Sequence, residues 1–366
     1  PWAPAPWEVP SWAGFIAFEA PVAGRSLPAN EPTTRPVVTF ARYDAWFVQD
    51  HHAGHTLIVG DTLHACQRLS ALLCRSTPGG TTPRGELGDL RAPSRGAHAR
   101  AIEAALQHIA AGDIYQVNLT HAWQGRLRGD PLWLALAMRD QSPVPFGAYF
   151  DFGEHQLIAR SMERFLRFDQ HSRVLRNRPI KGTRVRTQSD LSDARVALAR
   201  DPKERAEHAM IVDLMRNDLG RVAQVGTVLV EDVMQVEPYR GLYHLVSTVH
   251  CRVRDDVGLD NILHATFPPG SVTGAPKLRA LQIIEALETH PRGAYTGALG
   301  FIDRTGGLSL AVTIRAAAIQ QGRVTYHAGG GIVSASHSAR EIDETVLKAR
   351  VFLDAVGAEP HQHLAP

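Results

Sequence analysis

Cysteine is scarce in this chain, and its scarcity limits the kinds of protein that the sequence can encode. The 366 residues include three cysteines, Cys66, Cys74 and Cys251, and no two of them form a Cys-x-x-Cys pair. An odd number without paired spacing argues against a disulfide framework and against a zinc site built from cysteine. It is typical of a protein kept in a reducing compartment, so we expect a cytoplasmic location.

Long apolar runs and an excess of one charge are missing too. No run of apolar residues approaches the ~20 that a membrane-spanning helix needs. No basic stretch followed by an apolar run, as in a secretory signal, opens the sequence. The formal net charge is +2, so the overall field does not attract nucleic acid or an anionic membrane. We therefore expect neither of these among the partners.

The order of the elements that are present indicates a large α+β protein. Apolar Ile102, Leu106 and Ile109 recur at helical spacing and predict a helix over 97–111. Further helices are predicted at 130–139, 191–199, 203–217, 259–265, 275–287 and 338–356. Strands are predicted at 14–18, 37–40, 45–48, 56–59, 114–119, 146–152, 156–159, 227–236, 245–253, 297–302, 309–316 and 322–328. Many strands interspersed with separate helices favour an α+β body.

A stretch rich in glycine and proline divides the chain. Residues 77–96 (TPGGTTPRGELGDLRAPSRG) predict a linker. We expect residues 1–76 to form a β-rich N-terminal region, residues 97–358 the main domain, and residues 359–366 a tail. Because the sequence opens with proline rather than methionine, we expect the N-terminal region to be truncated.

One lysine stands in an unusual local setting. Lys181 follows Pro179-Ile180 and precedes Gly182. Because proline restricts the backbone and glycine lets it pass close to other groups, we expect Lys181 on a defined loop. A lysine amine held in this way can serve as a nucleophile once it is deprotonated. A lone lysine in such a turn is also often an ordinary exposed side chain.

Two predicted helices carry acidic residues on defined faces. Glu207 shares a face with apolar residues of the helix over 203–217, and a carboxylate there needs an arginine or a metal as its partner. Glu341, Glu344 and Lys348 line one face of the C-terminal helix. A surface ion pair between Glu344 and Lys348 explains that spacing as well as a binding site does.

Two glycine-rich segments and one histidine complete the set of candidates. The segment 269–277 leads into a predicted helix, whose N-terminus could receive an anion. Glycines 329–331 follow a predicted strand and could bring bare backbone N–H groups close to a carboxylate. Either segment could equally be a simple tight turn. His244 begins a predicted strand, where a histidine is commonly a satisfied core residue, so none of these features decides the function alone.

Taken together and in order, these segments resemble the chorismate-utilising enzymes. That family includes anthranilate synthase large subunits, isochorismate and salicylate synthases, and aminodeoxychorismate synthase component I. The matching segments include GDIYQVNLT (112–120), SMERF (161–165), RPIKGTR (178–184), HLVSTV (244–249), FPPGSVTGAPK (267–277), AYTGALGFID (294–303), AGGGIV (328–333) and EIDETVLKA (341–349). The resemblance implies the fold of the family, a β-sandwich core with flanking helices.

The resemblance also implies roles for individual side chains. It makes Lys181 the nucleophile, Glu163 the general acid and base, and His244 a polar neighbour of the substrate ring. It implies that Mg²⁺ is bound by three carboxylates, Glu207, Glu341 and Glu344. It implies that chorismate is held by Ser271, Thr273, Tyr295, Arg315, Gly330, Gly331 and Lys348.

Two positions separate the branches of the family. Lys181 stands where anthranilate synthases have alanine, and Gln116 stands where isochorismate and salicylate synthases have a water-activating lysine. The resemblance therefore implies amination of chorismate at C4, on the route to 4-aminobenzoate and folate. Met162 replaces the proline that usually precedes the glutamate corresponding to Glu163. Anthranilate synthase component I and a non-catalytic chorismate-binding paralogue are the alternatives.

The source of ammonia is expected to be a second protein. A glutaminase of the relevant kind needs an activated cysteine, typically on a tight elbow flanked by glycines. None of the three cysteines of this chain has flanking glycines. We therefore expect a separate glutamine amidotransferase subunit as partner, as the resemblance also implies.

Overall fold

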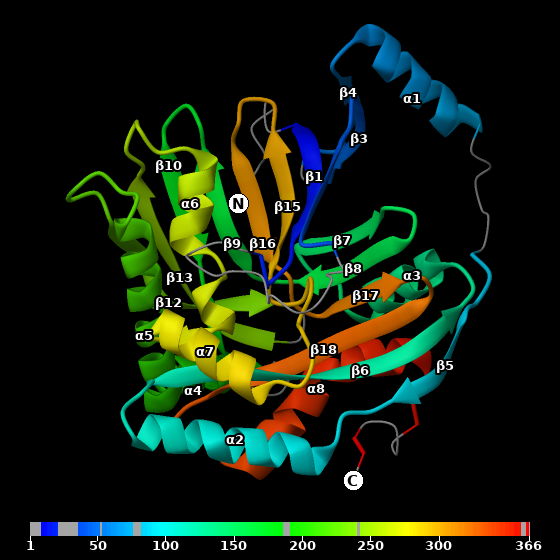
Figure 1. Cartoon of the computed structure of the whole chain (residues 1–366). Helices are drawn as coiled ribbons and strands as arrows, with labels where there is room; N and C mark the ends of the chain where they lie inside the picture. Colours follow the sequence, from blue (N-terminus) through cyan, green and yellow to red (C-terminus); the bar gives the residue numbers. More distant parts are fainter. Residues whose placement is uncertain are drawn as a thin grey trace.

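Two large antiparallel sheets form the body of the protein. The computed structural model describes residues 9–20, 36–51, 53–75, 82–185, 191–239, 242–359 and 364–365. Helices lie on the outside of the two sheets (Figure 1). Within the described ranges, no helix has both the length and the apolar character needed to cross a membrane.

The larger sheet joins strands from both ends of the chain. In spatial order its strands are β11 (Ile180–Val185), β13 (Leu242–Arg252), β10 (Val174–Arg178), β9 (Arg164–Asp169), β16 (Leu308–Val312), β15 (Ala298–Asp303), β1 (Pro10–Ile16) and β2 (Val38–Arg42), and β12 (Leu229–Tyr239) also pairs with β13. Because β1 pairs directly with β15, the expected boundary after residue 76 does not separate the N-terminal strands from the main domain.

The smaller sheet carries the glycine-rich strand. In spatial order its strands are β14 (Gly274–Ala275), β6 (Gln116–Arg128), β18 (Arg323–Ile332), β17 (Ala316–Gln320), β8 (His155–Ser161) and β7 (Phe146–Asp151), and β5 (Glu86–Arg91) also pairs with β6. Strand β5 lies inside the expected linker 77–96, so that expectation is corrected. Leu87 and Leu90 of β5 pack against the core, but so short an apolar pattern is hidden by the surrounding glycines and prolines.

A small hairpin with its own helix projects from this body. β3 (Ala45–Asp50) and β4 (His55–Gly60) form a two-stranded sheet, followed by α1 (Leu63–Arg75) (Figure 1). Arg304, beyond the end of β15, donates to the Gly60 carbonyl at 3.0 Å and lies 3.0 Å from Asp61. Helix α1 was not predicted from the sequence.

The remaining helices follow α1 along the chain. They are α2 (Arg95–Ala110), α3 (Pro131–Gln141), α4 (Leu191–Arg200), α5 (Pro202–Gly220), α6 (Leu259–Thr266), α7 (Lys277–Leu287) and α8 (Ser338–Val356). Asp130 and Asp201 accept hydrogen bonds from the first backbone N–H groups of α3 and α5, and proline occupies the first turn of each. Helices α2, α7 and α8 contact the smaller sheet, whereas α4 and α5 contact β11 and β13.

Two of the places where the chain passes from one sheet to the other are neighbours: one lies between β8 and β9 and the other between β16 and β17. The backbones of the two crossings are joined, since Val312 N donates to Glu163 O at 3.0 Å and Arg160 N donates to Arg315 O at 3.1 Å. The single strand predicted at 309–316 is therefore two strands. Arg315 lies at the bend with φ of 51°, which is uncommon for a residue other than glycine.

Candidate active site

Glu163 lies buried at the crossing between β8 and β9. Burial raises the pKa of its carboxyl group to about 7, although the Ser271 hydroxyl and the Lys181 amine both lie close enough to favour the charged form. A carboxyl group with this pKa can give up a proton and take it back near neutral pH. The residue for which the resemblance implies acid and base chemistry is thus in a setting that suits it.

Lys181 lies on a strand rather than on the loop expected from its neighbours. It pairs with Leu245 of β13, and the register shifts immediately after it, where Gly182 has φ of 70°. Pro179 and Gly182 therefore flank an irregularity in β11 instead of a turn. Burial lowers the pKa of the Lys181 amine, an effect that the Glu207 carboxylate opposes. A lysine in this setting is more readily neutral, and hence nucleophilic, than one in water.

Three glutamates approach one another from two helices. Burial raises the pKa of Glu207 on α5, and the negative charges of Glu341 and Glu344 on α8 add to that rise. Lys348 Nζ lies 2.7 Å from Glu344 Oε1 and lowers the pKa of Glu344. Across the described ranges, no three His, Cys, Asp or Glu side chains are placed to hold a metal ion by themselves. A cation here would need further oxygens, from water or from a ligand.

The glycines at 329–331 lie within a strand, which corrects the expectation that they follow one. Strand β18 continues to Ile332, and the three glycines pair with β6. A Cβ atom on Gly329 would lie 2.0 Å from the Leu119 carbonyl oxygen. Only glycine allows β18 and β6 to approach so closely at this point.

The next two glycines face the charged side chains. A Cβ atom on Gly330 would lie 3.5 Å from both Glu341 Oε2 and Lys348 Nζ, and one on Gly331 would lie 2.4 Å from Gln116 Nε2. The Gln116 side chain is buried, and neither its oxygen nor its nitrogen has a hydrogen-bond partner among the described residues. The same space is therefore bordered by the backbone of Gly330 and Gly331, the side-chain amide of Gln116 and the amine of Lys348.

Two aromatic rings and two basic groups form another side of this region. His244 Nδ1 lies 3.0 Å from the Gly182 carbonyl oxygen, and burial lowers the pKa of His244, with nearby Arg315 contributing. Burial raises the pKa of Tyr295 to about 12, so its phenol keeps its proton. Its ring stacks on His327 with centroids 5.4 Å apart. His327 was not among the predicted site residues, because no motif in the sequence marks it.

The turn before α7 presents Ser271. It contains a short 3₁₀ helix, Gly270–Val272, in which Ser271 is buried. The Thr273 hydroxyl donates to the carbonyl oxygens of Pro269 and Gly270, each at 3.2 Å. The Thr273 hydroxyl therefore stabilises the turn that the resemblance implies is close to the substrate.

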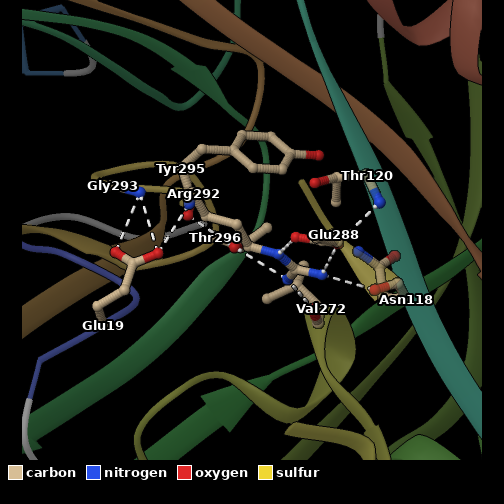
Figure 2. A network of polar contacts seen from close by, with 9 residues as sticks. All are labelled: Glu19, Asn118, Thr120, Val272, Glu288, Arg292, Gly293, Tyr295 and Thr296. Atoms are coloured by element: carbon tan, nitrogen blue, oxygen red, sulfur yellow. Dashed lines mark hydrogen bonds and ion pairs between the residues drawn. The ribbon is translucent and has the colours of Figure 1, made fainter. Parts of the chain in front are cut away.

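A buried ion pair next to this turn was also missed. Arg292 and Glu288 follow α7, and their side chains lie 2.7 Å apart (Figure 2). Opposite charges four residues apart are the signal that could have found the pair. This spacing predicts a contact only when both residues lie in one helix. Because α7 ends at Leu287, the spacing of Glu288 and Arg292 did not predict their contact.

Comparison with known proteins places these residues in context. A family model described as chorismate binding enzyme matches residues 2–354. Aminodeoxychorismate synthase from Streptomyces griseus is 44% identical over 261 residues, which cover 71% of this chain and 36% of that protein. Anthranilate synthase component 1 from Aquifex aeolicus is 40% identical over 257 residues, which cover 70% of this chain and 52% of that protein. The chain thus spans about a third of the first relative and about half of the second.

Solved structures share the fold. Anthranilate synthase component I from Streptococcus pneumoniae superposes with a TM-score of 0.83 at 28% identity, covering 96% of this chain and 82% of that one. The menaquinone-specific isochorismate synthase from Escherichia coli superposes with a TM-score of 0.71 at 21% identity, covering 94% and 78%, and that likeness concerns the fold alone. The predicted fold class is confirmed.

Proposed function

Because the chain belongs to the family of chorismate-binding enzymes, we propose that it aminates chorismate at C4 to give 4-amino-4-deoxychorismate, as aminodeoxychorismate synthase component I. The observation that carries this proposal is the pair formed by Lys181 and Glu163. A lysine whose pKa is lowered by burial lies close to a carboxyl group with a pKa of about 7. The pair can supply a nucleophile and a proton in one step.

The proposed reaction uses each member of the pair twice. The neutral amine of Lys181 attacks C2 of the ring, the two ring double bonds shift towards C4, and the C4 hydroxyl leaves as water with the proton of Glu163. Ammonia then attacks C4, the double bonds shift back, and the lysine amine departs from C2. The Glu163 carboxylate takes a proton from the new ammonium group. Chorismate and ammonia become aminodeoxychorismate and water, and both side chains return to their starting states.

The basic and hydrogen-bonding groups around the pair suit a substrate with two carboxylates. In the proposed complex, Lys348, Arg315 and the Tyr295 phenol hold these carboxylates, with the backbone of Gly330 and Gly331 close by. The Lys348 amine already lies beside Glu344 and the Gly329 carbonyl oxygen, 3.0 Å from the latter. Binding energy of this kind orients the ring for attack.

Glu207, Glu341 and Glu344 fit a divalent cation of the Mg²⁺ type. Their oxygens are the donors that Mg²⁺ prefers, and that ion commonly retains waters and shares ligand oxygens, which agrees with a set incomplete by itself. When bound, Mg²⁺ would neutralise these carboxylates and attract the ring carboxylate of chorismate. We expect Glu341→Gln to reduce ammonia-dependent turnover by at least a hundredfold while thermal unfolding stays within a few degrees of wild type. Full activity of that variant in Mg²⁺ would contradict the metal assignment.

The supply of ammonia is proposed to come from a glutamine amidotransferase subunit. Cys251 is buried and burial raises its pKa to about 11, the opposite of what an activated thiol needs. Purified chain should therefore be active with ammonium and inactive with glutamine alone. Adding the amidotransferase should restore activity with glutamine. Turnover of glutamine by this chain without a second subunit would contradict the partner proposal.

Anthranilate synthase component 1 is the second candidate, because relatives with that name match this chain at 40% and 43% identity. Product analysis separates the two functions. Chorismate, ammonium and Mg²⁺ should give aminodeoxychorismate with its enolpyruvyl group intact, whereas an anthranilate synthase would release pyruvate. Release of pyruvate together with anthranilate would overturn the proposal. Binding of chorismate without turnover would instead favour a non-catalytic paralogue.

A further inference from the structure

The Arg292 side chain is a buried cation with every donor in use. Its guanidinium has five N–H groups, and five hydrogen bonds occupy them (Figure 2). Two go to the Glu288 carboxylate, from Nε at 2.9 Å and from the second terminal nitrogen at 2.7 Å. The other three leave the ion pair and reach separate stretches of the chain.

Those three stretches each border the candidate active site. Arg292 donates to the Val272 carbonyl oxygen at 2.9 Å, next to Ser271. It donates to the Asn118 carbonyl oxygen at 2.6 Å, on β6 where that strand pairs with the glycines of β18. It donates to the Thr296 hydroxyl at 3.2 Å, directly after Tyr295. One planar group thus sets the spacing between three walls of the site.

The stretch that holds Tyr295 needs such support. Thr296 is β-branched and has φ of 58°, a conformation that is strained for this residue type. Its N–H donates to the Thr313 carbonyl oxygen at 2.7 Å, and its hydroxyl donates to the Tyr295 carbonyl oxygen at 2.6 Å. The contact with Arg292 adds to these bonds. A strained backbone beside a ligand-binding ring persists only where its surroundings impose it.

Glu19 holds the same stretch from the other side. Its carboxylate accepts hydrogen bonds from the backbone N–H of Arg292 at 2.7 Å and of Gly293 at 3.0 Å (Figure 2). The Phe18 N–H donates to the Gly293 carbonyl oxygen at 2.8 Å, and the guanidinium of Arg292 lies over the Phe18 ring at 4.4 Å. Phe18 and Glu19, just after β1, therefore hold the backbone of Arg292 in place, and the Arg292 side chain contacts the three segments around the site.

We infer that Arg292, held by Glu288 and Glu19, is a positioning residue that keeps Tyr295 and Ser271 at the separation chorismate requires. The inference rests on the proposed function, in that chorismate is taken as the ligand. Lysine has three donors and no planar fork. Arg292→Lys therefore keeps the positive charge but cannot hold all of the segments that Arg292 connects at their present separation. Small displacements of binding groups are known to cost large factors in enzymes.

The test measures chorismate affinity apart from turnover. We expect Arg292→Lys to raise the KM for chorismate, and its Kd measured by calorimetry without ammonium, at least tenfold, with a smaller fractional change in kcat. Glu19→Gln retains the size of the side chain but removes its negative charge and replaces one of the two acceptor oxygens with an N–H donor. We expect that variant to raise both constants three- to tenfold.

Arg173 provides the matched control. Its guanidinium donates to the Arg254 and Val257 carbonyl oxygens at 2.5 and 2.7 Å and lies 5.1 Å from the Phe168 ring, but it contacts none of the site segments. Arg173→Lys should lower the melting temperature and leave the KM for chorismate within twofold of wild type.

Each remaining outcome decides against one proposal. If Arg292→Lys binds chorismate within twofold of wild type, the inference is wrong and the proposed function stands. If Arg173→Lys weakens chorismate binding as much as Arg292→Lys does, the effect is general destabilisation of the fold, and the inference again fails. If Arg292→Lys does not fold, an unchanged KM in Glu19→Gln overturns the inference. If the wild-type chain does not bind chorismate, the proposed function itself is refuted.

Discussion

A single buried carboxyl group, Glu163, shows how the fold sets the chemistry of a side chain. Its charged form is favoured by Ser271 and Lys181 and disfavoured by burial, and burial is the larger effect. It lies at the crossing between β8 and β9, where only 6% of its surface is exposed. The sequence motif indicated the residue, but its pKa follows from the junction of the sheets.

The first expectation concerns the pH dependence of Glu163. The acid must be protonated to release the C4 hydroxyl, so with a pKa of about 7 its active form is complete below that pH and declines above it. At constant free ammonia, kcat/KM for chorismate should fall about tenfold per pH unit on the alkaline side. Glu163→Gln should lose most activity, and its residual rate should lack this decline. An identical alkaline decline in that variant would assign the titration to another group.

The second expectation concerns a covalent intermediate on Lys181. Without ammonia the second step cannot proceed, so incubation with chorismate and Mg²⁺ should leave an adduct on this lysine, detectable by mass spectrometry of peptides. Lys181→Ala should lose aminodeoxychorismate synthesis by orders of magnitude. Lys203, near Glu207 on the exposed side of α5, is the control, since Lys203→Ala should still form the adduct. Unchanged rates in Lys181→Ala would remove it from the mechanism.

At the scale of elements, β18 and β6 show two kinds of glycine side by side. A Cβ atom at Gly329 would meet backbone at 2.0 Å, whereas one at Gly330 would meet only side-chain atoms at 3.5 Å. We expect Gly329→Ala to destabilise the fold by about 3 kcal/mol, seen as a lower urea midpoint. Gly330→Ala should keep the free energy of unfolding within about 0.5 kcal/mol of wild type and weaken chorismate binding. Equal midpoints in the two variants would contradict the close approach of the strands.

Helices were the elements best predicted from the sequence. The helix predicted at 338–356 is confirmed with the same ends, and that at 203–217 is confirmed within α5, because apolar periodicity is a local signal. Lys181 and the glycines at 329–331 were expected in turns and lie in strands. Proline and glycine signal a turn locally, but here pairing with a distant strand overrides that signal.

The residues of the candidate site also fall into two groups, those marked by local motifs and those brought together by pairing between distant segments. Motif resemblance indicated the side chains that carry charge or a nucleophile, and the structure brings Glu163, Lys181, Glu207, Glu341 and Glu344 within electrostatic reach of one another. Arg292 and Glu19 could not be found in this way. They are 273 positions apart in the sequence, and their contact depends on β1 pairing with β15.

The whole molecule contains buried histidines that should make it sensitive to acid. Burial lowers the pKa of His98 to about 3 and that of His121 to about 4, and their rings meet edge to face at 3.6 Å. An unfolded histidine titrates near pH 6.5, so below that pH the unfolded chain binds protons that the native chain does not. Each of these histidines should then lower the free energy of unfolding by up to about 1.4 kcal/mol for each pH unit below 6.5. His208, whose pKa burial lowers to about 4, adds to this loss, whereas Asp218 and Glu163, whose pKa values burial raises to about 6 and about 7, act in the opposite direction.

The net expectation is a lower free energy of unfolding at pH 5 than at pH 7, measured by urea titration. His98→Gln should lower stability at pH 7, since the Thr345 contact at 3.4 Å is disturbed, and should show a shallower loss between the two pH values. Equal slopes in the variant and the wild type would show that these histidines do not control acid sensitivity.

The β8–β9 and β16–β17 crossings are adjacent in space but far apart in the sequence, so the candidate active site is completed late in synthesis. Glu163 and Lys181 leave the ribosome midway, whereas Arg315 and the glycines of β18 follow much later, and Glu341, Glu344 and Lys348 come with α8. A nascent chain that has reached residue 337 carries the proposed nucleophile and acid but lacks Glu341 and Glu344, two of the three carboxylates proposed to bind Mg²⁺. Lys181 is therefore translated well before several of the groups that we propose to bind the substrate.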